Sequence, residues 1–301
     1  MNNHSTKIEL TGASGFVGRN LVEFLESDFI VKTLQIRYKD IQQISLDSNI
    51  IIHLAGKAHD LKNVAMPIEY YQANTELTKT IFDAFLSSDA EKFIFFSSVK
   101  AVKDTVIGVL KEEEMVTPET DYGKSKQLAE QYILEHLPQN KKVYILRPCM
   151  IHGEYNKGNL NLLYHLVKNN IPYPLGAFEN QRSFLGIKNL CFIIKELIDR
   201  NDIPSGIYHL ADNETISTKD LVLLIGKIIN KKVRVINIPK NIVKNIALVG
   251  DIIRLPFNTE RLKKLTENYV VSNQKIKKAL GLNLPFSCIE GLTETIKSFS
   301  K

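Results

Sequence analysis

The sequence predicts an α/β protein with a Rossmann-like, doubly wound parallel sheet and a smaller, mostly helical C-terminal lobe. Two observations predict this class. The apolar runs at residues 50–54 and 92–96 are continuous rather than alternating, which is typical of strands covered by helices on both faces. Helical periodicity at residues 74–85 separates these runs, and strands that alternate with helices pair in parallel.

The opening of the chain follows the same order. Residues 7–10 form a short apolar strand, the segment TGASGFVG follows, and residues 19–25 have the pattern of an amphipathic helix. Residues 31–36 alternate like a second strand, while a helix at 123–136 and a strand at 142–146 continue the alternation.

The regular alternation decays after Pro148, and we place a domain boundary there, between residues 1–150 and 151–301. The first domain is predicted to be abridged after its second strand, because residues 37–50 are too few for the usual additional helix and strand. Strand exchange between the two domains is compatible with this division.

The second domain has the pattern of helices joined by short strands and loops. We predict helices at 160–168, at 189–200 and after Ser217, a loop at 172–184 and a strand at 206–211.

The stretch at 242–257 is apolar but carries Lys244, Asp251 and Arg254. We interpret it as a helix that faces the core. A cap over the substrate and a contact with a membrane surface are the alternatives.

The composition is that of an ordinary globular protein, with 44% hydrophobic and 24% charged residues among 301. The three cysteines, Cys149, Cys191 and Cys288, are too few and too widely spaced for a disulfide framework or a metal site, so no metal is expected. No apolar run reaches about 18 residues, and the start MNNHSTKIEL lacks the pattern of a signal peptide. We therefore expect a cytoplasmic protein without an integral membrane segment.

The net charge of +6 raises the question of nucleic acid, because basic surfaces attract phosphates. The lysines are scattered, however. The pairs at 231–232, 263–264 and 277–278 alternate with apolar helical positions, which indicates solvated helix faces. We expect no nucleic acid and favour a small phosphorylated ligand.

Three glycines, Gly12, Gly15 and Gly18, stand between the first predicted strand and the first helix. They permit a tight turn and a close approach of the backbone, so that N–H groups and the positive end of the helix dipole face a pyrophosphate. An acidic residue about 20 positions further on would mark the ribose of NAD. Here the second strand ends in Arg37, which suits the 2′-phosphate of NADP or is an exposed residue at a strand end. NAD or NADP is therefore expected, with Arg37 in favour of NADP.

Tyr122 and Lys126 are one helical turn apart and lie on the same face of a helix. A free tyrosine titrates near about 10, so reaction at neutral pH requires positive charge beside its phenolate, which a lysine ammonium and a cationic nicotinamide provide. Ser98 follows the strand at 92–96, where its hydroxyl can bond the same substrate oxygen. The order of these groups, each beside a strand end, predicts an active site.

The segments TGASGFVG, IIHLAG, FFSSVKAV, YGKSK and ILRPCMIHG resemble the successive motifs of extended short-chain dehydrogenases/reductases, the nucleotide-sugar epimerases and dehydratases. The resemblance covers nearly the whole chain and implies an NAD(P)-dependent enzyme that acts on a nucleotide-diphosphate sugar. It makes Tyr122 the catalytic acid and base, Lys126 its partner, and Ser98 the ligand of the substrate hydroxyl. A homodimer through the helix that bears Tyr122 is common in the family and is expected here.

The resemblance also assigns binding residues. Residues 1–150 become the NAD(P)-binding domain and residues 151–301 the lobe that binds the nucleotide sugar. Asn159 and Arg182 are candidate contacts of the substrate diphosphate, although a surface ion pair is the alternative for Arg182. Asn74 would support the central strands, and Cys149 would lie near the nicotinamide. The candidate cofactor ligands are Gly12, Gly15, Phe16, Val17, Gly18, Arg37, Leu54, Ala55, Gly56, Lys126 and Pro148.

Family members that dehydrate the sugar carry an Asp-Glu pair after the catalytic hydroxyl residue, whereas Val99 and Lys100 follow Ser98 here, so a 4,6-dehydratase is not expected. We predict 4-epimerisation of a UDP-hexose or UDP-N-acetylhexosamine through a transient 4-keto intermediate, in surface-polysaccharide biosynthesis. One alternative is an NAD(P)H-dependent 4-ketoreductase of a nucleotide-linked 4-keto-6-deoxy sugar, which Arg37 and the abridged first domain favour. A non-catalytic protein that senses NADP is another, and a lipid-linked substrate is a variant suggested by residues 242–257.

Overall fold

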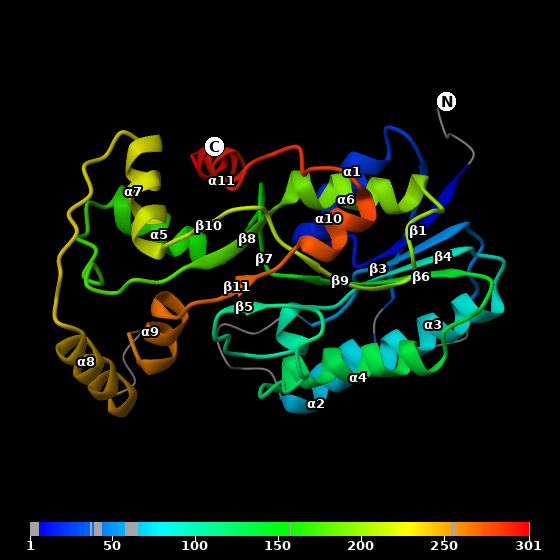
Figure 1. Ribbon diagram of the computed structural model, residues 1–301, viewed down its shortest axis with the longest axis horizontal. Helices are drawn as coiled ribbons and strands as arrows, with labels where there is room; N and C mark the ends of the chain where they lie inside the picture. Colours follow the sequence, from blue (N-terminus) through cyan, green and yellow to red (C-terminus); the bar gives the residue numbers. More distant parts are fainter. Residues whose placement is uncertain are drawn as a thin grey trace.

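The computed structural model describes residues 6–36, 38, 44–57, 66–156, 158–253 and 257–300. Its centre is a six-stranded sheet in the order β2-β1-β3-β4-β6-β9, with every adjacent pair parallel (Figure 1). The strands are β1 (Lys7–Thr11), β2 (Ile30–Leu34), β3 (Ile50–His53), β4 (Lys92–Phe96), β6 (Lys142–Pro148) and β9 (Gly206–Leu210).

Helices cover both faces of this sheet (Figure 1). One face carries α1 (Phe16–Leu25), α6 (Ile187–Asp199) and α10 (Gln274–Leu280), and the other carries α2 (Pro67–Tyr70), the π-helix η1 (Tyr71–Glu76), α3 (Leu77–Ser87) and α4 (Asp121–Glu135). Each face has its own apolar core, one around Leu10 and Leu21 and the other around Phe82 and Phe93. Strands buried on both faces explain the continuous apolar runs, and the prediction of a doubly wound sheet is confirmed.

Strand β1 lies between β2 and β3, since Ile8 pairs with Val31 on one side and with Ile50 on the other. The order of strands therefore reverses at β1, and open α/β sheets bind ligands at the carboxyl ends of the strands at such a point. Among the described residues between Leu34 and Ile50 there is no helix or strand. Arg37, the residue predicted to favour NADP, lies outside the described residues.

Most of the chain after β6 builds a second, smaller layer. Strands β7 (Met150–His152), β8 (Arg182–Gly186) and β10 (Thr215–Ile216) form one sheet, and β5 (Val109–Leu110) pairs with β11 (Val270–Val271). The predicted loop at 172–184 is wrong at its end, because the backbone of β8 pairs with both β7 and β10. The helices of this layer are α5 (Asn159–Lys168), α7 (Thr218–Ile228), α8 (Lys240–Ile252), α9 (Thr259–Thr266) and α11 (Cys288–Ser298).

The division of the chain at residue 150 stays a prediction. Strand β9 and helix α6 both follow residue 150, yet β9 pairs with β6 in the large sheet and α6 packs on α1.

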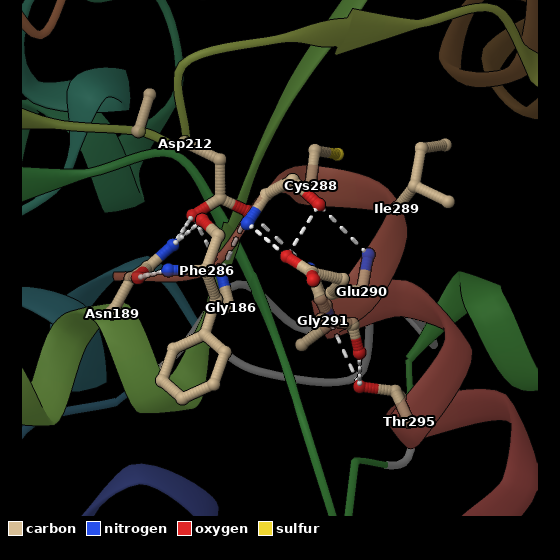
Figure 2. A network of polar contacts seen from close by, with 12 residues as sticks. Gly186, Asn189, Asp212, Phe286, Cys288, Ile289, Glu290, Gly291 and Thr295 are labelled. Carbon is tan, nitrogen blue, oxygen red and sulfur yellow. Dashed lines mark hydrogen bonds and ion pairs between the residues drawn. The ribbon is translucent and has the colours of Figure 1, made fainter. Parts of the chain in front are cut away.

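A buried carboxylate ties the C-terminal segment to this framework (Figure 2). Asp212 accepts hydrogen bonds from the backbone N–H of Gly186 at 3.0 Å and from Nδ2 of Asn189 at 2.7 Å. Asn189 in turn bonds both backbone groups of Phe286, just before α11, and Nδ1 of His152 lies 2.9 Å from the hydroxyl of Thr295 on α11. These contacts fix α11 against β7 and β8.

The interpretation of residues 242–257 as a core-facing helix is wrong for most of its apolar side chains. Helix α8 buries Val243, Ala247 and Gly250, whereas Ile246 and Ile252 are exposed. The apolar pattern predicted a buried helix, but the side of α8 that packs inward is formed by these three smaller residues. None of the helices in the described ranges has the length and apolar character needed to cross a membrane.

Candidate active site

The turn after β1 is shaped for a phosphate. Gly12 has φ +76°, which favours glycine, and a Cβ at Gly18 would lie 2.3 Å from the carbonyl oxygen of Gly12. Helix α1 begins at Phe16, three residues before the predicted start, and no side chain caps its N-terminus. Uncapped N–H groups in a glycine cradle at a helix N-terminus fit a pyrophosphate.

A first cavity of about 350 Å³ opens at the carboxyl ends of β1, β3, β4 and β6. Ala55 is absent from its lining; its N–H donates to the hydroxyl of Thr11 at 3.1 Å. Lys57, Phe96, Ser97 and Ile151 line it without having been predicted. The predicted residues that line it are Gly12, Gly15, Phe16, Val17, Gly18, Leu54, Gly56, Ser98, Tyr122, Lys126, Pro148 and Cys149.

Tyr122 and Ser98 lie beside each other in the lining of this cavity. Burial raises the pKa of Tyr122 and the Ser98 side chain opposes this shift, so the direction is opposite to that expected from a nearby lysine. The hydroxyl of Thr120 caps α4 by accepting from the N–H of Gly123. A Cβ at Gly123 would lie 2.4 Å from the carbonyl oxygen of Lys100, so glycine allows the helix to start against the Ser98 loop.

Lys126 lies one turn further along α4, with Nζ donating to the carbonyl oxygen of Phe96 at 2.8 Å. Burial lowers its pKa to about 8, and Glu130 opposes the shift. Glu130 is itself paired with Arg147 of β6, with Nη2 2.5 Å from Oε2, and both side chains are 3% exposed. The ammonium therefore sits beside a buried ion pair.

Asn74 and His53 brace the strand ends, which fits the supporting role expected of Asn74. Asn74 lies in the π-helix η1, a feature frequent at functional sites, and its Oδ1 accepts from the N–H of Lys57 at 2.8 Å. The hydroxyl of Thr78 donates to the carbonyl oxygen of Asn74, so it accepts from Nε2 of His53 at 3.0 Å. Nδ1 of His53 then accepts from Thr11 at 2.7 Å, and burial lowers the pKa of His53 to about 3, which keeps the ring neutral.

A second cavity of about 510 Å³ adjoins the first and shares Ser98, Tyr122, Pro148 and Cys149 with it. It extends between β7, β8 and helices α5 and α9. Asn159, the first residue of α5, and Arg182, the first residue of β8, both line it. The structure therefore places both candidate substrate residues in a cavity that Ser98 and Tyr122 also line.

The second cavity is lined by charges of both signs, the basic side chains being Lys100, Arg182, Lys263 and Lys264 and the carboxylates Asp104, Glu119, Glu260 and Glu267. Arg182 donates to the carbonyl oxygen of Lys264, burial lowers its pKa, and among the described residues it makes no ion pair, so it is not the surface ion pair considered above. Lys263 and Lys264 of α9 also line the cavity, and Lys263 is exposed, as expected of a solvated helix position. Nζ of Lys100 donates to the carbonyl oxygen of Asp104 at 2.7 Å.

These lysines escaped prediction because they reach the cavity only through tertiary packing of α9 and of the Ser98 loop. Glu260, Glu267 and Tyr269 join them in the lining. Only the position of Lys100, two residues after Ser98, gave a signal in the sequence.

The chain is similar to known proteins along most of its length. The model of the NAD dependent epimerase/dehydratase family matches residues 8–211. UDP-glucose 4-epimerase of Vibrio cholerae is 30% identical over 317 positions, which cover 97% of this chain and 95% of the relative. A second relative is the N-acetyl-alpha-D-glucosaminyl-diphospho-ditrans,octacis-undecaprenol 4-epimerase of Escherichia coli O157:H7, 27% identical over 96% of this chain and 93% of its own length.

The fold is shared with solved structures at lower identity. MoeE5 in complex with UDP-glucose and NAD superimposes with a TM-score of 0.77 at 15% identity, covering 98% of each chain. The matched segment, residues 8–211, includes both the glycine turn and the Tyr122 helix. The chain belongs to the NAD dependent epimerase/dehydratase family and is an NAD(P)-dependent enzyme of that family.

Proposed function

We propose that this enzyme is a 4-epimerase of a nucleotide-diphosphate sugar, a UDP-hexose or UDP-N-acetylhexosamine. One observation carries the proposal: Tyr122 and Ser98 line both the cavity behind the glycine turn and the cavity of the second layer. A sugar in the second cavity would present its hydroxyl to these two groups at the mouth of the first. The two relatives described above, both 4-epimerases, agree with this reaction.

Tyr122, Ser98 and Lys126 have different proposed roles in proton transfer. Tyr122 would take the proton of the sugar C4 hydroxyl as that carbon is oxidised, and would return it to the same oxygen when the 4-keto sugar is reduced on its other face. Ser98 would hold that oxygen in place. The nicotinamide, when bound, supplies the acceptance and return of hydride. With a pKa of about 8, Lys126 is mostly charged at neutral pH. Its charge would favour the phenolate of Tyr122.

Arg182 and Asn159 are the proposed contacts of the substrate diphosphate. The guanidinium fork matches phosphate oxygens, and the N-terminus of α5, which no side chain caps, offers N–H groups beside Asn159. Lys263 and Lys264 add positive charge at the same cavity. Four carboxylates line the same cavity and Lys264 pairs with Glu260 at 2.5 Å, so the proposed recognition of the diphosphate rests mainly on Arg182 and the N-terminus of α5.

The neighbours of Ser98 argue against dehydration of the sugar. Val99 is buried and apolar, and Lys100 is a base whose pKa is lowered by burial. Elimination of water needs an acid and base pair at this place, and neither residue is a carboxylate. The 4-ketoreductase is the second candidate, because the described residues between β2 and β3 lack the helix and strand of a full nucleotide fold.

The first experiment separates these two reactions. The purified protein is denatured and any released nucleotide identified, and the native protein is then incubated with UDP-N-acetylglucosamine with and without NADPH. Retained NAD and interconversion with the 4-epimer, without net change of cofactor, are expected. An empty site, with NADPH oxidised only by a 4-keto sugar, would instead establish the reductase.

Variants on one helix test the role of Tyr122. Tyr122→Phe removes the proton carrier and is expected to lower kcat by about 10²–10⁴-fold. Tyr132→Phe is the matched control. The hydroxyl of Tyr132 donates to Oδ1 of Asp83 at 2.6 Å, and neither residue lines either cavity. Equal activity of the two variants would contradict the assignment.

A homodimer and a role in surface-polysaccharide synthesis complete the proposal. Helix α4 exposes Leu128 and Leu134, and the adjacent α2 exposes Ile68, which suits a helical interface between two copies. Light scattering after size exclusion tests the dimer, and analysis of surface glycans after gene deletion tests the biological role.

A further inference from the structure

Helix α8 presents an apolar surface that covers nothing within the described part of the chain. In Figure 1 it lies at the far end of the molecule from the large sheet, next to α9. Ile252 is 80% exposed and Ile246 is 48% exposed. We define the α8 face by its exposed apolar residues, which are Ile242, Ile246, Leu248, Val249, Ile252 and Ile253.

The orientation of α8 explains this exposure. Val243, Ala247 and Gly250 recur at intervals of three and four and form the buried side. The backbone of Phe257 fills the space beside Gly250, where a Cβ would lie 1.9 Å from its carbonyl oxygen. The helix is therefore anchored by small residues, and its larger apolar side chains are not needed for the core. A helix face made of exposed apolar side chains indicates an interaction site.

Charge around the α8 face indicates the partner. Among the described residues between 240 and 266, five are basic, namely Lys240, Lys244, Arg261, Lys263 and Lys264, and two are acidic, namely Asp251 and Glu260. Lys240 and Lys244 fall on the polar flank of α8, with Asp251 between them around the helix axis. An apolar face with a basic flank matches helices that lie in the interface of anionic bilayers.

A second copy of the chain fits the α8 face less well. A helix of 13 residues is about 20 Å long, so the area that it offers is well below the roughly 800 Å² per partner of a stable interface. A symmetric contact would also bring the lysines of the two copies together. A bilayer needs neither a large area nor an opposing acidic surface on a protein.

Helix α8 also lies beside one wall of the proposed substrate cavity. Helix α9 packs beside α8 and contributes Glu260, Lys263 and Lys264 to the lining of the second cavity. A membrane under α8 would therefore lie near the end of the cavity that holds these lysines.

We propose that the α8 face binds the surface of an anionic lipid bilayer and holds the second cavity where a sugar joined through a diphosphate to a membrane lipid can enter. The substrate part of this inference rests on the proposed function. The diphosphate would meet the same cationic side chains as that of a nucleotide sugar, and the lipid would leave the cavity toward α8.

Flotation of the full chain with vesicles tests the membrane contact. Vesicles of phosphatidylcholine with about one quarter phosphatidylglycerol are compared with phosphatidylcholine alone. The wild type is expected to float with the anionic vesicles, and the triple variant Ile246→Asn, Val249→Asn, Ile252→Asn is expected to lose about tenfold or more of its partitioning. The matched control places asparagine at the exposed Ile107 and Ile171, which lie outside α8.

Failure of the wild type to float, or equal flotation of the triple variant and the wild type, would overturn the membrane contact. A change from dimer to monomer in the triple variant, without vesicle binding by the wild type, would assign the face to a second copy instead. A thermal unfolding transition of the triple variant at the same temperature as that of the wild type shows that the substitutions leave the fold intact.

Turnover tests the substrate part separately. The wild type should epimerise N-acetylglucosaminyl-diphospho-polyprenol in anionic vesicles, and the triple variant should do so about tenfold more slowly. Both proteins should turn over UDP-N-acetylglucosamine in solution at the same rate. Turnover of the UDP sugar without turnover of the lipid-linked sugar would leave the proposed function standing and refute the lipid-linked substrate.

Discussion

The buried pair of Glu130 and Arg147 gives the sharpest prediction from the structure. The guanidinium binds the carboxylate through Nε, 2.9 Å from Oε1, and through Nη2, 2.5 Å from Oε2, and Ser97 donates a further hydrogen bond to Oε1. Glu130→Gln keeps the shape but removes the charge, which leaves the cation of Arg147 buried without its partner. We expect the free energy of unfolding to fall by about 3–5 kcal/mol, the usual cost of breaking a buried pair.

A double variant separates the cost of the unpaired charge from the value of the pair. Glu130→Leu with Arg147→Met replaces both partners by apolar groups, and we expect it to be much closer to the wild type than Glu130→Gln. Urea unfolding followed by circular dichroism measures both variants at one pH and ionic strength.

The same substitution has a second readout at Lys126. Glu130 raises the pKa of that ammonium against the effect of burial, so its removal should lower the pKa below about 8. If the charge of Lys126 favours the phenolate of Tyr122, the alkaline fall of kcat should move to lower pH in Glu130→Gln. A loss of stability under about 1 kcal/mol, together with an unmoved pH profile, would refute the reasoning on both counts.

Three further predictions concern the cofactor turn, the substrate cavity and acid stability. Gly18→Ala places a Cβ 2.3 Å from the backbone oxygen of Gly12, so affinity for NAD measured by fluorescence titration should fall at least about tenfold, while Gly281→Ala should leave it unchanged. Arg182→Met should raise KM for the UDP sugar by about 10–100-fold with little change of kcat, as expected for a lost charged hydrogen bond; a fall in kcat alone would contradict a role in binding. Burial lowers the pKa of His53 and of His209 to about 3. Below a pH of about 6.5 the unfolded chain therefore binds protons at these two residues, whereas the folded state does not. Stability should therefore be lost as the pH falls from 7 to 5, by about 2 kcal/mol for each histidine, and unfolding free energies that are flat over this range would contradict it.

The central sheet was predictable from the sequence because its evidence is local. A strand buried on both faces must be apolar along its whole length, and the run at 92–96 shows this without knowledge of its neighbours. The glycine turn and the spacing of Tyr122 and Lys126 are equally local, and the first cavity gathers them.

The second layer was less predictable, because contacts between distant segments decide its shape. Strand β8 is only five residues long and forms through pairing with β7 and β10, so its residues resembled a loop. Lys264 reaches Arg182 from 82 residues away along the chain. The outward rotation of α8 follows from the fit of Gly250 against Phe257, which periodicity alone does not reveal.

The position of β9 at the edge of the large sheet has a consequence for biosynthesis. Strand β6 is complete at Pro148, but its partner at 206–210 is made only after the intervening residues have been translated, which takes about 3–11 s at about 5–20 residues per second. During this interval the emerging chain carries an open sheet edge, a template for pairing with other chains. Helix α6, which covers α1, is also still missing. A gene fragment that stops at residue 150 should therefore yield aggregated material, and we expect chaperones that shield open strands to bind the nascent chain in this window.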